Sequence, residues 1–474
     1  GWAELKNSKR PVMTDAPSKN ALATFPMSCA EHRELVALFD ALEPDPSWSF
    51  AGCTTRDTTR LSHGYHRYPA KFIPQLVDRL LDEYLGEASE ACVNDPFMGS
   101  GTTVVCAIER GYRATCTDIN DVAYLITKAK AIPIEPKKLE RYLSKRSEDL
   151  QCTVDDDGTV KRLSFLPASE HDPLSPHVPH HEQIDYWFPA AQKRDLGIIL
   201  AAIRRVEDED IQTFLLCCFS HILKNCSVWM TGSTKPTRSR TKRPAAPWPT
   251  FLRHLQYMVR RNADFWATVP PAVRARPHAF LDVRCQDARR QPRADASVDI
   301  LITSSPYVTS YEYADLHQLT ALWLEYARDL KAFRRKFIGT GFPHERPIQI
   351  QSSLGREIVA ALTEQDARLG TAAGHFFMDM EETFQEAWRI LKPGARACYV
   401  IGNTRLKGVE ILNAQVFAEG LLATGFVLER VILREIPSKI LPQVRDPVTG
   451  RFTSPENDHF HAYPVEYIVI ARKP

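Results

Sequence analysis

A short glycine-containing stretch of the chain is suited to holding a small ligand. It runs from Asn94 to Thr103 and reads Asn-Asp-Pro-Phe-Met-Gly-Ser-Gly-Thr-Thr. Gly99 and Gly101 let the backbone approach a ligand closely, and free N–H groups at the start of the predicted helix after Gly101 suit a carboxylate, a phosphate or an adenosine-bearing cofactor. The P-loop and dinucleotide patterns both fail, since no Lys-Ser/Thr pair follows and Val104 replaces the third glycine. Taken alone, such a turn is more often a plain strand-to-helix connection.

An acidic residue, Asp118, ends the next predicted strand and is followed by Ile119 and Asn120. A carboxylate at this position is placed to accept hydrogen bonds from ribose hydroxyls. Asp118 is also placed to cap the following helix, although Asn120 or Asp121 can supply that cap. The glycine turn earlier in the chain favours the ribose interpretation.

A third stretch, Thr303-Ser-Ser-Pro-Tyr307, follows a strongly apolar predicted strand. Ligands of open α/β sheets bind at the carboxyl ends of such strands. The Ser304 hydroxyl and the Ser305 carbonyl can accept the hydrogens of an exocyclic amino group, and the Tyr307 ring can stack on the base that carries it. Taken alone, the sequence is commoner as a plain turn.

These three stretches need a parallel sheet that brings the carboxyl ends of their strands to one edge. The chain begins with the order strand, glycine turn, helix, strand and acidic residue, which is typical of a doubly wound α/β domain. The alternation stops after residue 131 and resumes at residue 279. The predicted strands cover residues 90–94, 113–117, 279–284, 298–303, 397–402, 426–436 and 466–472, the last two as an antiparallel pair. The predicted helices cover residues 30–42, 74–85, 102–110, 121–131, 195–206, 211–223, 249–266, 379–391 and 414–424.

The pattern divides the chain into four parts. Residues 1–55 form a polar lead-in, residues 56–131 the first part of an α/β domain, residues 132–278 a long and mainly helical insertion, and residues 279–474 the second part of the α/β domain. The insertion holds a run of five basic residues without an acidic one. These are Lys235, Arg238, Arg240, Lys242 and Arg243. Such a run is a candidate for contact with nucleic-acid phosphates, and a solvated loop explains it equally well.

Composition excludes several classes of protein. Hydrophobic residues make up 44% and charged residues 25%, an ordinary globular balance that excludes wholesale disorder. With 60 basic and 58 acidic residues the net charge is +2, which does not reveal a partner. No apolar run approaches the roughly 18 residues that span a bilayer, and residues 1–20 do not form a secretory signal. We therefore expect a cytoplasmic protein without a membrane partner.

Cysteine and histidine give no sign of a metal site. The 11 cysteines include no Cys-x-x-Cys pair, which favours reduced thiols over disulfides or a zinc ribbon. A cluster of histidines lies among prolines, where a solvated loop is favoured over a metal site. Its members are His171, His177, His180 and His181.

Together, the stretches 95–103 and 304–307 resemble the DNA amino-methyltransferases, which transfer a methyl group from S-adenosylmethionine to N4 of cytosine or N6 of adenine. The serine at position 304 is similar to the cytosine-N4 branch of that family. Residues 66–72, His-Arg-Tyr-Pro-Ala-Lys-Phe, resemble the segment that closes over the methionine part of the cofactor. The resemblance covers residues 60–130 and 280–472 and includes Leu391-Lys-Pro-Gly394 in the C-terminal half.

The resemblance implies a Rossmann-like fold, S-adenosylmethionine as cofactor and double-stranded DNA as substrate, with residues 132–278 as the candidate target-recognition region. It implies that Asp287 faces the adenine of the cofactor. The implied catalytic residues are Ser304, Ser305, Pro306 and Tyr307. The implied cofactor-binding residues are Pro69, Ala70, Lys71, Phe72, Asp95, Pro96, Phe97, Gly99, Ser100, Gly101, Thr102, Thr103, Asp118, Ile119 and Asp287.

One departure from the family pattern concerns Ser305, where the family usually has proline. Its carbonyl can still accept a hydrogen bond, but the turn is less stiff. The implied reaction is direct attack by the N4 atom of a flipped cytosine on the sulfonium methyl, with Tyr307 stacked on the base. No cysteine adjoins a proline, so the cysteine nucleophile of a 5-methylating enzyme is missing.

Alternatives remain open from the sequence. The target can be adenine N6, the substrate can be RNA, or the chain can be a DNA-binding relative that has lost catalysis. A cognate restriction endonuclease is a candidate partner.

Overall fold

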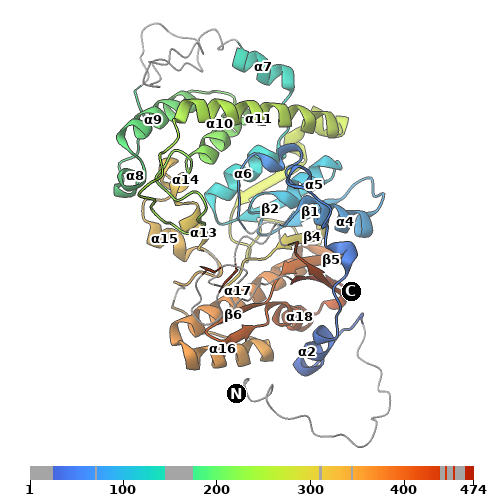
Figure 1. Cartoon of the computed structure of the whole chain (residues 1–474). Helices are drawn as coiled ribbons and strands as arrows, with labels where there is room; N and C mark the ends of the chain where they lie inside the picture. The colour runs from blue at the N-terminus through green and yellow to red at the C-terminus, as the bar shows by residue number, and fades with distance from the viewer. Residues whose placement is uncertain are drawn as a thin grey trace, which may run out of the picture.

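A seven-stranded sheet with the order β3-β2-β1-β4-β5-β11-β8 runs through the centre of the molecule (Figure 1). The computed structural model describes residues 25–69, 72–144, 175–308, 312–342, 345–437, 444–445, 452–453 and 465–474. Five strands are parallel: β1 (Cys92–Asp95), β2 (Arg113–Asp118), β3 (Leu281–Cys285), β4 (Val298–Ser304) and β5 (Leu391–Ile401). Strand β11 (Val465–Arg472) is antiparallel to β5 and to β8 (Val427–Glu435). The predicted fold class is confirmed: a Rossmann-like α/β fold with an antiparallel end.

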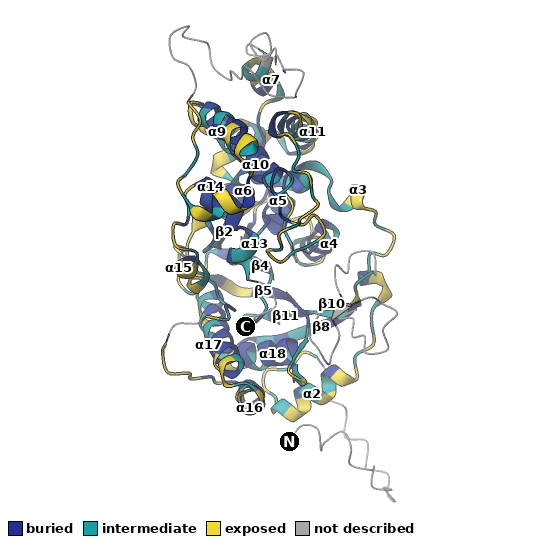
Figure 2. Ribbon diagram, turned by 60° about the vertical axis from the view of Figure 1, so that its left-hand side comes forward, coloured by how far each residue is buried: buried dark blue, intermediate teal, exposed yellow. Residues whose placement is uncertain are grey.

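The sheet is covered by helices on both faces because its strands are apolar on both sides. In β4, Ile300 and Ile302 pack against one cluster, whereas Val298 and Leu301 pack against the other. The first cluster includes α4 (Pro74–Leu85) and α5 (Thr102–Glu109), and α6 (Asp121–Ala131) packs beside α5. The second face carries α2 (His32–Asp40), α16 (Ser353–Gln365), α17 (Ala367–Ile390) and α18 (Asn413–Thr424). Figure 2 shows buried residues in this central layer and also in the helices above it.

The stretch predicted as an insertion forms a helical layer beyond α6, at the top of Figure 1. Its core joins apolar side chains of α9, α10 and α11 to Trp323. Its helices are α7 (Pro136–Ser144), α8 (Glu182–Trp187), α9 (Ala190–Arg204), α10 (Glu209–Ile222), α11 (Pro247–Thr268) and α12 (Pro271–Ala275). The three helices predicted here are present, and α9 begins earlier than expected because its first turn is polar and lacks the apolar spacing.

Between β4 and α16 lie three short helices that the sequence did not predict: α13 (Tyr313–Leu316), α14 (Gln318–Trp323) and α15 (Leu330–Arg335). Each is too short to show a helical period. The other short elements are η1 (Pro46–Trp48), α3 (Thr55–Thr58), η2 (Leu61–Gly64), η3 (Pro277–Ala279), β6 (Thr404–Leu406), β7 (Val409–Ile411), β9 (Val444–Arg445) and β10 (Phe452–Thr453). Among the described residues, no helix is both long and apolar enough to cross a membrane.

A buried asparagine of α11 holds the segment that leads from α6 into the helical layer. Asn262 Oδ1 accepts a hydrogen bond from the backbone N of Ile134 at 3.0 Å, and its Nδ2 donates to the Ile134 carbonyl at 2.9 Å. We predict that Asn262→Ala lowers the free energy of unfolding by about 2 kcal/mol, since both backbone groups lose their partner. Urea denaturation measures this loss. Gln256→Ala, on the exposed side of the same helix, is the control, and an equal effect of both variants would contradict the prediction.

Candidate functional site

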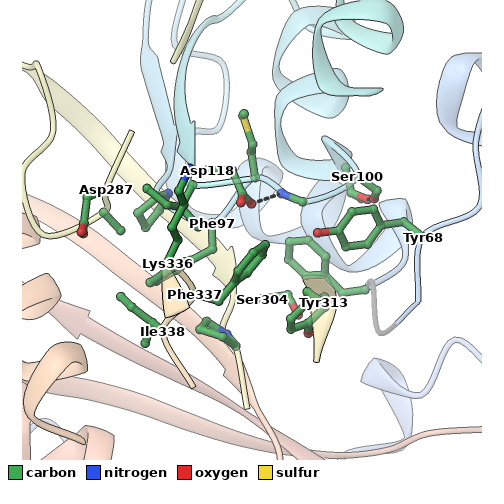
Figure 3. A pocket seen from close by; sticks show the side chains of 18 residues that line it. Tyr68, Phe97, Ser100, Asp118, Asp287, Ser304, Tyr313, Lys336, Phe337 and Ile338 are labelled. Carbon is green, nitrogen blue, oxygen red and sulfur yellow. Dashed lines mark hydrogen bonds between the residues drawn. The ribbon is translucent and has the colours of Figure 1, made fainter. Parts of the chain in front are cut away.

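A cavity of about 750 Å³, open solvent included, lies at the carboxyl ends of β1, β2 and β4 (Figure 3). Tyr68 lies on one side of it and Lys336 and Ile338 on the other. The residues that line it are Tyr68, Phe72, Pro96, Phe97, Met98, Gly99, Ser100, Thr102, Asp118, Ile119, Asp287, Ala288, Ser304, Pro306, Tyr313, Lys336, Phe337 and Ile338.

The glycine turn forms the floor of the cavity. Gly99 and Gly101 have φ angles of +48° and +81°, in the left-handed region that side chains disfavour. A Cβ atom on Gly99 would lie 3.2 Å from the Tyr68 ring, so the turn and this ring are in close contact. No side chain caps α5, which begins at Thr102, and its first N–H groups are free to bind an anionic or polar ligand.

Asp118 ties the second strand to the glycine turn. Its Oδ2 accepts a hydrogen bond from Gly99 N at 3.0 Å, and its Oδ1 accepts one from Asn120 N at 2.9 Å. The Asn120 side chain caps α6 by accepting a hydrogen bond from Val122 N, so Asn120 and not Asp118 serves as the helix cap. Burial raises the pKa of Asp118 to about 6. Each carboxylate oxygen keeps a lone pair for a ligand hydroxyl.

Asp95 links the glycine turn to the strand that carries Ser304. Its Oδ1 accepts hydrogen bonds from Phe97 N at 3.0 Å and from Thr303 Oγ1 at 2.6 Å. Asp95 is buried and does not line the cavity, and burial raises its pKa to about 7. Thr103 adds a second link, since its hydroxyl donates to the Ile302 carbonyl at 3.2 Å. The side chains of Asp95 and Thr103 therefore connect the glycine turn and the start of α5 to β4 below the cavity.

The four residues 304–307 divide between the cavity and the core. Ser304 and Pro306 line the cavity, whereas Ser305 is buried and its backbone N donates to the Val400 carbonyl at 3.2 Å. Tyr307 does not line the cavity. Its hydroxyl accepts a hydrogen bond from Gly402 N at 2.9 Å, and its ring packs against the core of the second sheet face.

Aromatic rings that sequence reasoning did not select form the walls of the cavity. The Tyr68 and Tyr313 rings lie 6.3 Å apart at 27°, and Tyr313 and Phe337 lie 6.5 Å apart at 14°. Figure 3 shows Tyr313 and Phe337 close to Ser304. Tyr68 lies within the recognised stretch 66–72, which was the available signal for it. Tyr313 and Phe337 carry no local motif.

The segment that supplies Phe337 is pressed against the catalytic turn predicted from sequence. Gly339 has a φ of +89°, and a Cβ atom there would lie 2.5 Å from the Tyr307 carbonyl oxygen. Only glycine fits this contact without displacing the backbone.

Asp287 lies on one side of the cavity, next to Ala288. Arg289 holds its carboxylate through the guanidinium at 2.6 Å and the backbone N at 2.8 Å. Burial raises the pKa of Asp287, but these hydrogen bonds outweigh burial, and the pKa lies below its ordinary value. Asp287 is therefore a fixed anion.

The remaining predicted residues have mixed positions. Phe72, Ser100 and Ile119 line the cavity, whereas Gly101, Thr103 and Pro69 do not. Ala70 and Lys71 lie outside the described residues.

The basic side chains of residues 235–243 differ in how far other groups of the protein engage them. The Nζ of Lys242 donates to the carbonyls of Lys224 and Trp229, each at 2.7 Å, and burial lowers its pKa. The guanidinium of Arg238 lies 4.8 Å from the centre of the Tyr186 ring in α8. Lys235, Arg238, Arg240 and Arg243 are exposed.

The histidines of the proline-rich loop contact other parts of the chain. His177 Nε2 lies 3.3 Å from Glu325, and His181 Nε2 lies 3.2 Å from the Arg328 carbonyl. His171 lies outside the described residues. Within the described ranges, no group of three or more candidate metal ligands occurs.

Comparison with known proteins finds similarity to DNA methyltransferases. The DNA methylase family model matches residues 26–129, which contain the glycine turn and Asp118. The Type II methyltransferase M.MvaI of Kocuria varians is 25% identical over 415 residues, covering 84% of this chain and 89% of the relative. The Type II methyltransferase M.MjaII of Methanocaldococcus jannaschii is 33% identical over 114 residues, covering 23% of this chain and 21% of that relative. The match over most of the chain and the cavity at the glycine turn agree, and the chain is similar to DNA methyltransferases over most of its length.

Proposed function

We propose that this enzyme transfers a methyl group from S-adenosylmethionine to the N4 amino group of a cytosine at a specific site in double-stranded DNA. The observation that carries the proposal is that Asp118 and Ser304 line one cavity, so a cofactor held by the first can meet a base held by the second. By similarity to its Type II relatives, the enzyme modifies the recognition site of a cognate restriction endonuclease. The proposed location is the cytoplasm.

The residues of the cavity fit S-adenosylmethionine. Asp118 can accept hydrogen bonds from the two ribose hydroxyls, and the glycine turn with the free N–H groups of α5 can approach the methionine part. The anionic Asp287 suits the exocyclic amino group of the adenine, and Ile119 and Phe337 offer apolar surface to its ring. When bound, the cofactor supplies an electrophilic methyl group.

Ser304 has the role of orienting the target amine. The N4 atom of cytosine is a poor nucleophile because its lone pair is delocalised into the ring. Hydrogen bonds from its N–H groups to the Ser304 hydroxyl and the Ser305 carbonyl favour a more tetrahedral nitrogen, whose lone pair can then point at the methyl group. Tyr313 lines the cavity and is the ring available to stack on the base, whereas Tyr307 does not line the cavity and packs against the core of the second sheet face.

The choice of base is tested directly on DNA. Plasmid from an expressing strain, digested to nucleosides and analysed by mass spectrometry, should contain N4-methylcytosine that an empty-vector control lacks. N6-methyladenine alone would reassign the target base while keeping the enzyme class. Absence of both modified bases, from a protein that is folded and expressed, would refute DNA modification and favour RNA or an inactive relative.

The role of Ser304 is tested by removing its hydroxyl. Ser304→Ala should lower kcat by about 10²-fold, the usual cost of losing one group that acts in the transition state. Cofactor affinity, measured by calorimetry, should stay the same. Ser305→Ala is the comparison, because it keeps the backbone carbonyl. Equal turnover of Ser304→Ala and the unmodified enzyme would remove Ser304 from the catalytic group.

The role of Asp118 predicts a pH dependence of cofactor binding. Burial raises the pKa of its carboxyl to about 6, so the free protein becomes protonated at this group as the pH falls below 6. Ribose hydroxyls need the ionised form, and affinity should fall about tenfold per pH unit below that value, since one proton must leave on binding. Titration with S-adenosylhomocysteine from pH 5 to 8 measures this slope.

Asp118→Asn is the matched control for that slope. It should bind more weakly at pH 8 and show no slope between pH 5 and 7. A flat profile for the unmodified enzyme would contradict the ribose assignment.

A further inference from the structure

A second basic stretch lies beside the cavity. Residues 330–342 contain four basic residues and no acidic one, because α15 and the segment after it read Leu-Lys-Ala-Phe-Arg-Arg-Lys-Phe-Ile-Gly-Thr-Gly-Phe. Arg335, Lys336 and Phe342 are exposed. The stretch matches the charge pattern of residues 235–243, but it lies much closer to the catalytic cavity.

This stretch runs from the cavity to the surface through two further hollows. Lys336 and Phe337 line the cavity itself and also a neighbouring hollow of about 640 Å³. Arg335 lines that hollow and a third one of about 650 Å³, open solvent included in both values. Phe342 and Arg368 form the outer walls of the third hollow. One continuous surface therefore leads from Ser304 to Phe342.

Phe342 is a large apolar side chain held in solvent. It is 43% exposed, and the guanidinium groups of Arg368 and Arg334 lie 4.7 and 5.8 Å from the centre of its ring. Its backbone is anchored, since Glu312 Oε1 accepts a hydrogen bond from Gly341 N at 2.7 Å and Thr340 Oγ1 accepts one from Phe342 N at 3.1 Å. An exposed ring on a fixed backbone is suited to stacking on a partner.

The cations of this surface differ in how far the protein neutralises them. Arg334 pairs with Asp315 at 2.6 Å, and Arg346 pairs with Asp379 at 2.9 Å. Arg335, Lys336 and Arg368 form no ion pair with any residue that the structure describes. Their charge is available to an anionic partner.

We propose that residues 330–342 and Arg368 form a second DNA-binding surface at the mouth of the cavity, where Arg335 and Arg368 contact phosphates and the Phe342 ring stacks on a base beside the flipped nucleotide. The inference rests on the proposed function and adds the place where the duplex lies. Flipping a base out of the duplex costs free energy because its neighbours lose their stacking partner. An aromatic ring that stacks on such a neighbour offsets part of this free energy. The complementary charge favours DNA over an apolar protein partner.

The surface continues toward the basic stretch 235–243. Arg328, just before α15, contacts His181 at the start of α8, and Tyr186 of the same helix lies under Arg238. Helix α8 therefore links the two basic stretches through these contacts, and Figure 1 shows α8 and α15 on the same side of the molecule. A duplex that covers the cavity can contact both.

The phosphate contacts are tested by the salt dependence of binding. The double variant Arg335→Gln/Arg368→Gln should bind a 30-base-pair duplex of mixed sequence at least tenfold more weakly, and the slope of log K against log salt should fall by about 1.8, or about 0.9 per phosphate. Arg33→Gln/Arg113→Gln, on an exposed position of α2 and at the exposed amino end of β2, is the matched control and should bind as the unmodified enzyme does.

The stacking contact is tested at Phe342. Phe342→Ala should weaken binding to plasmid DNA and raise KM for DNA about tenfold, the usual value of one stacked base, without changing the salt slope. Ile348→Ala is the control, since Ile348 is an exposed apolar residue, 37% accessible, outside the proposed surface. Circular dichroism of each variant verifies that it is folded.

The outcomes separate this inference from the proposed function. Methylation of DNA by the unmodified enzyme, with both variants binding as tightly as it does, would overturn the surface and keep the function. Binding can also be measured with transfer RNA as competitor. If the double variant binds transfer RNA more weakly but binds DNA as the unmodified enzyme does, the surface is not a DNA-binding surface. If the unmodified enzyme does not methylate DNA, the proposed function is refuted. The inference that this surface holds DNA for catalysis then fails with it.

Discussion

The site depends on one buried carboxylate between the two central strands. Asp95 ends β1, Thr303 lies near the end of β4, and a single oxygen of Asp95 accepts both the Thr303 hydroxyl and the Phe97 backbone N–H. A buried carboxyl without partners would be strongly destabilising, so the two strands must keep this register. The glycine turn follows Asp95 and Ser304 follows Thr303. In the proposed function, the position of the cofactor relative to the target amine therefore depends on a hydrogen bond that neither of them touches.

Other parts of the fold form the walls of the cavity around the link between Asp95 and Thr303. Asp118 brings the end of β2 to the glycine turn, and the segment from Lys336 to Ile338 closes the opposite side. Different helices cover the two faces of the sheet. The helical layer lies beyond one face, and α16, α17 and α18 pack on the other. The cavity lies where the strand order changes direction, between β1 and β4, as is general for ligand sites of open α/β sheets.

The elements with local signals were predictable from sequence. The glycine turn, Asp118 and the apolar strand before Ser304 each follow from a few adjacent residues. The orientation of Tyr307 was not predictable, because its partner is the N–H of Gly402, far along the chain. The predicted stacking of Tyr307 on the base requires its ring to face the cavity, and the ring packs against the core instead.

Other differences have similar causes. Helix α17 is longer than predicted, since Asp366 caps it through Arg368 N and Leu369 N. Gly370, a residue type that disfavours helix, lies where a Cβ atom would clash with Thr363, so close packing of α16 and α17 explains the glycine. Tyr313 and Phe337 belong to a region of very short helices without periodicity, where only tertiary contacts bring the rings to the cavity.

Gly339 sets the spacing between the outer segment and the turn that carries Ser304. A Cβ atom at position 339 would lie 2.5 Å from the Tyr307 carbonyl oxygen, so the two segments are in direct backbone contact. Even the methyl group of alanine would have to push them apart. The distance from Phe342 to Ser304 is therefore set by a residue that has no side chain, and any substitution at position 339 would change it.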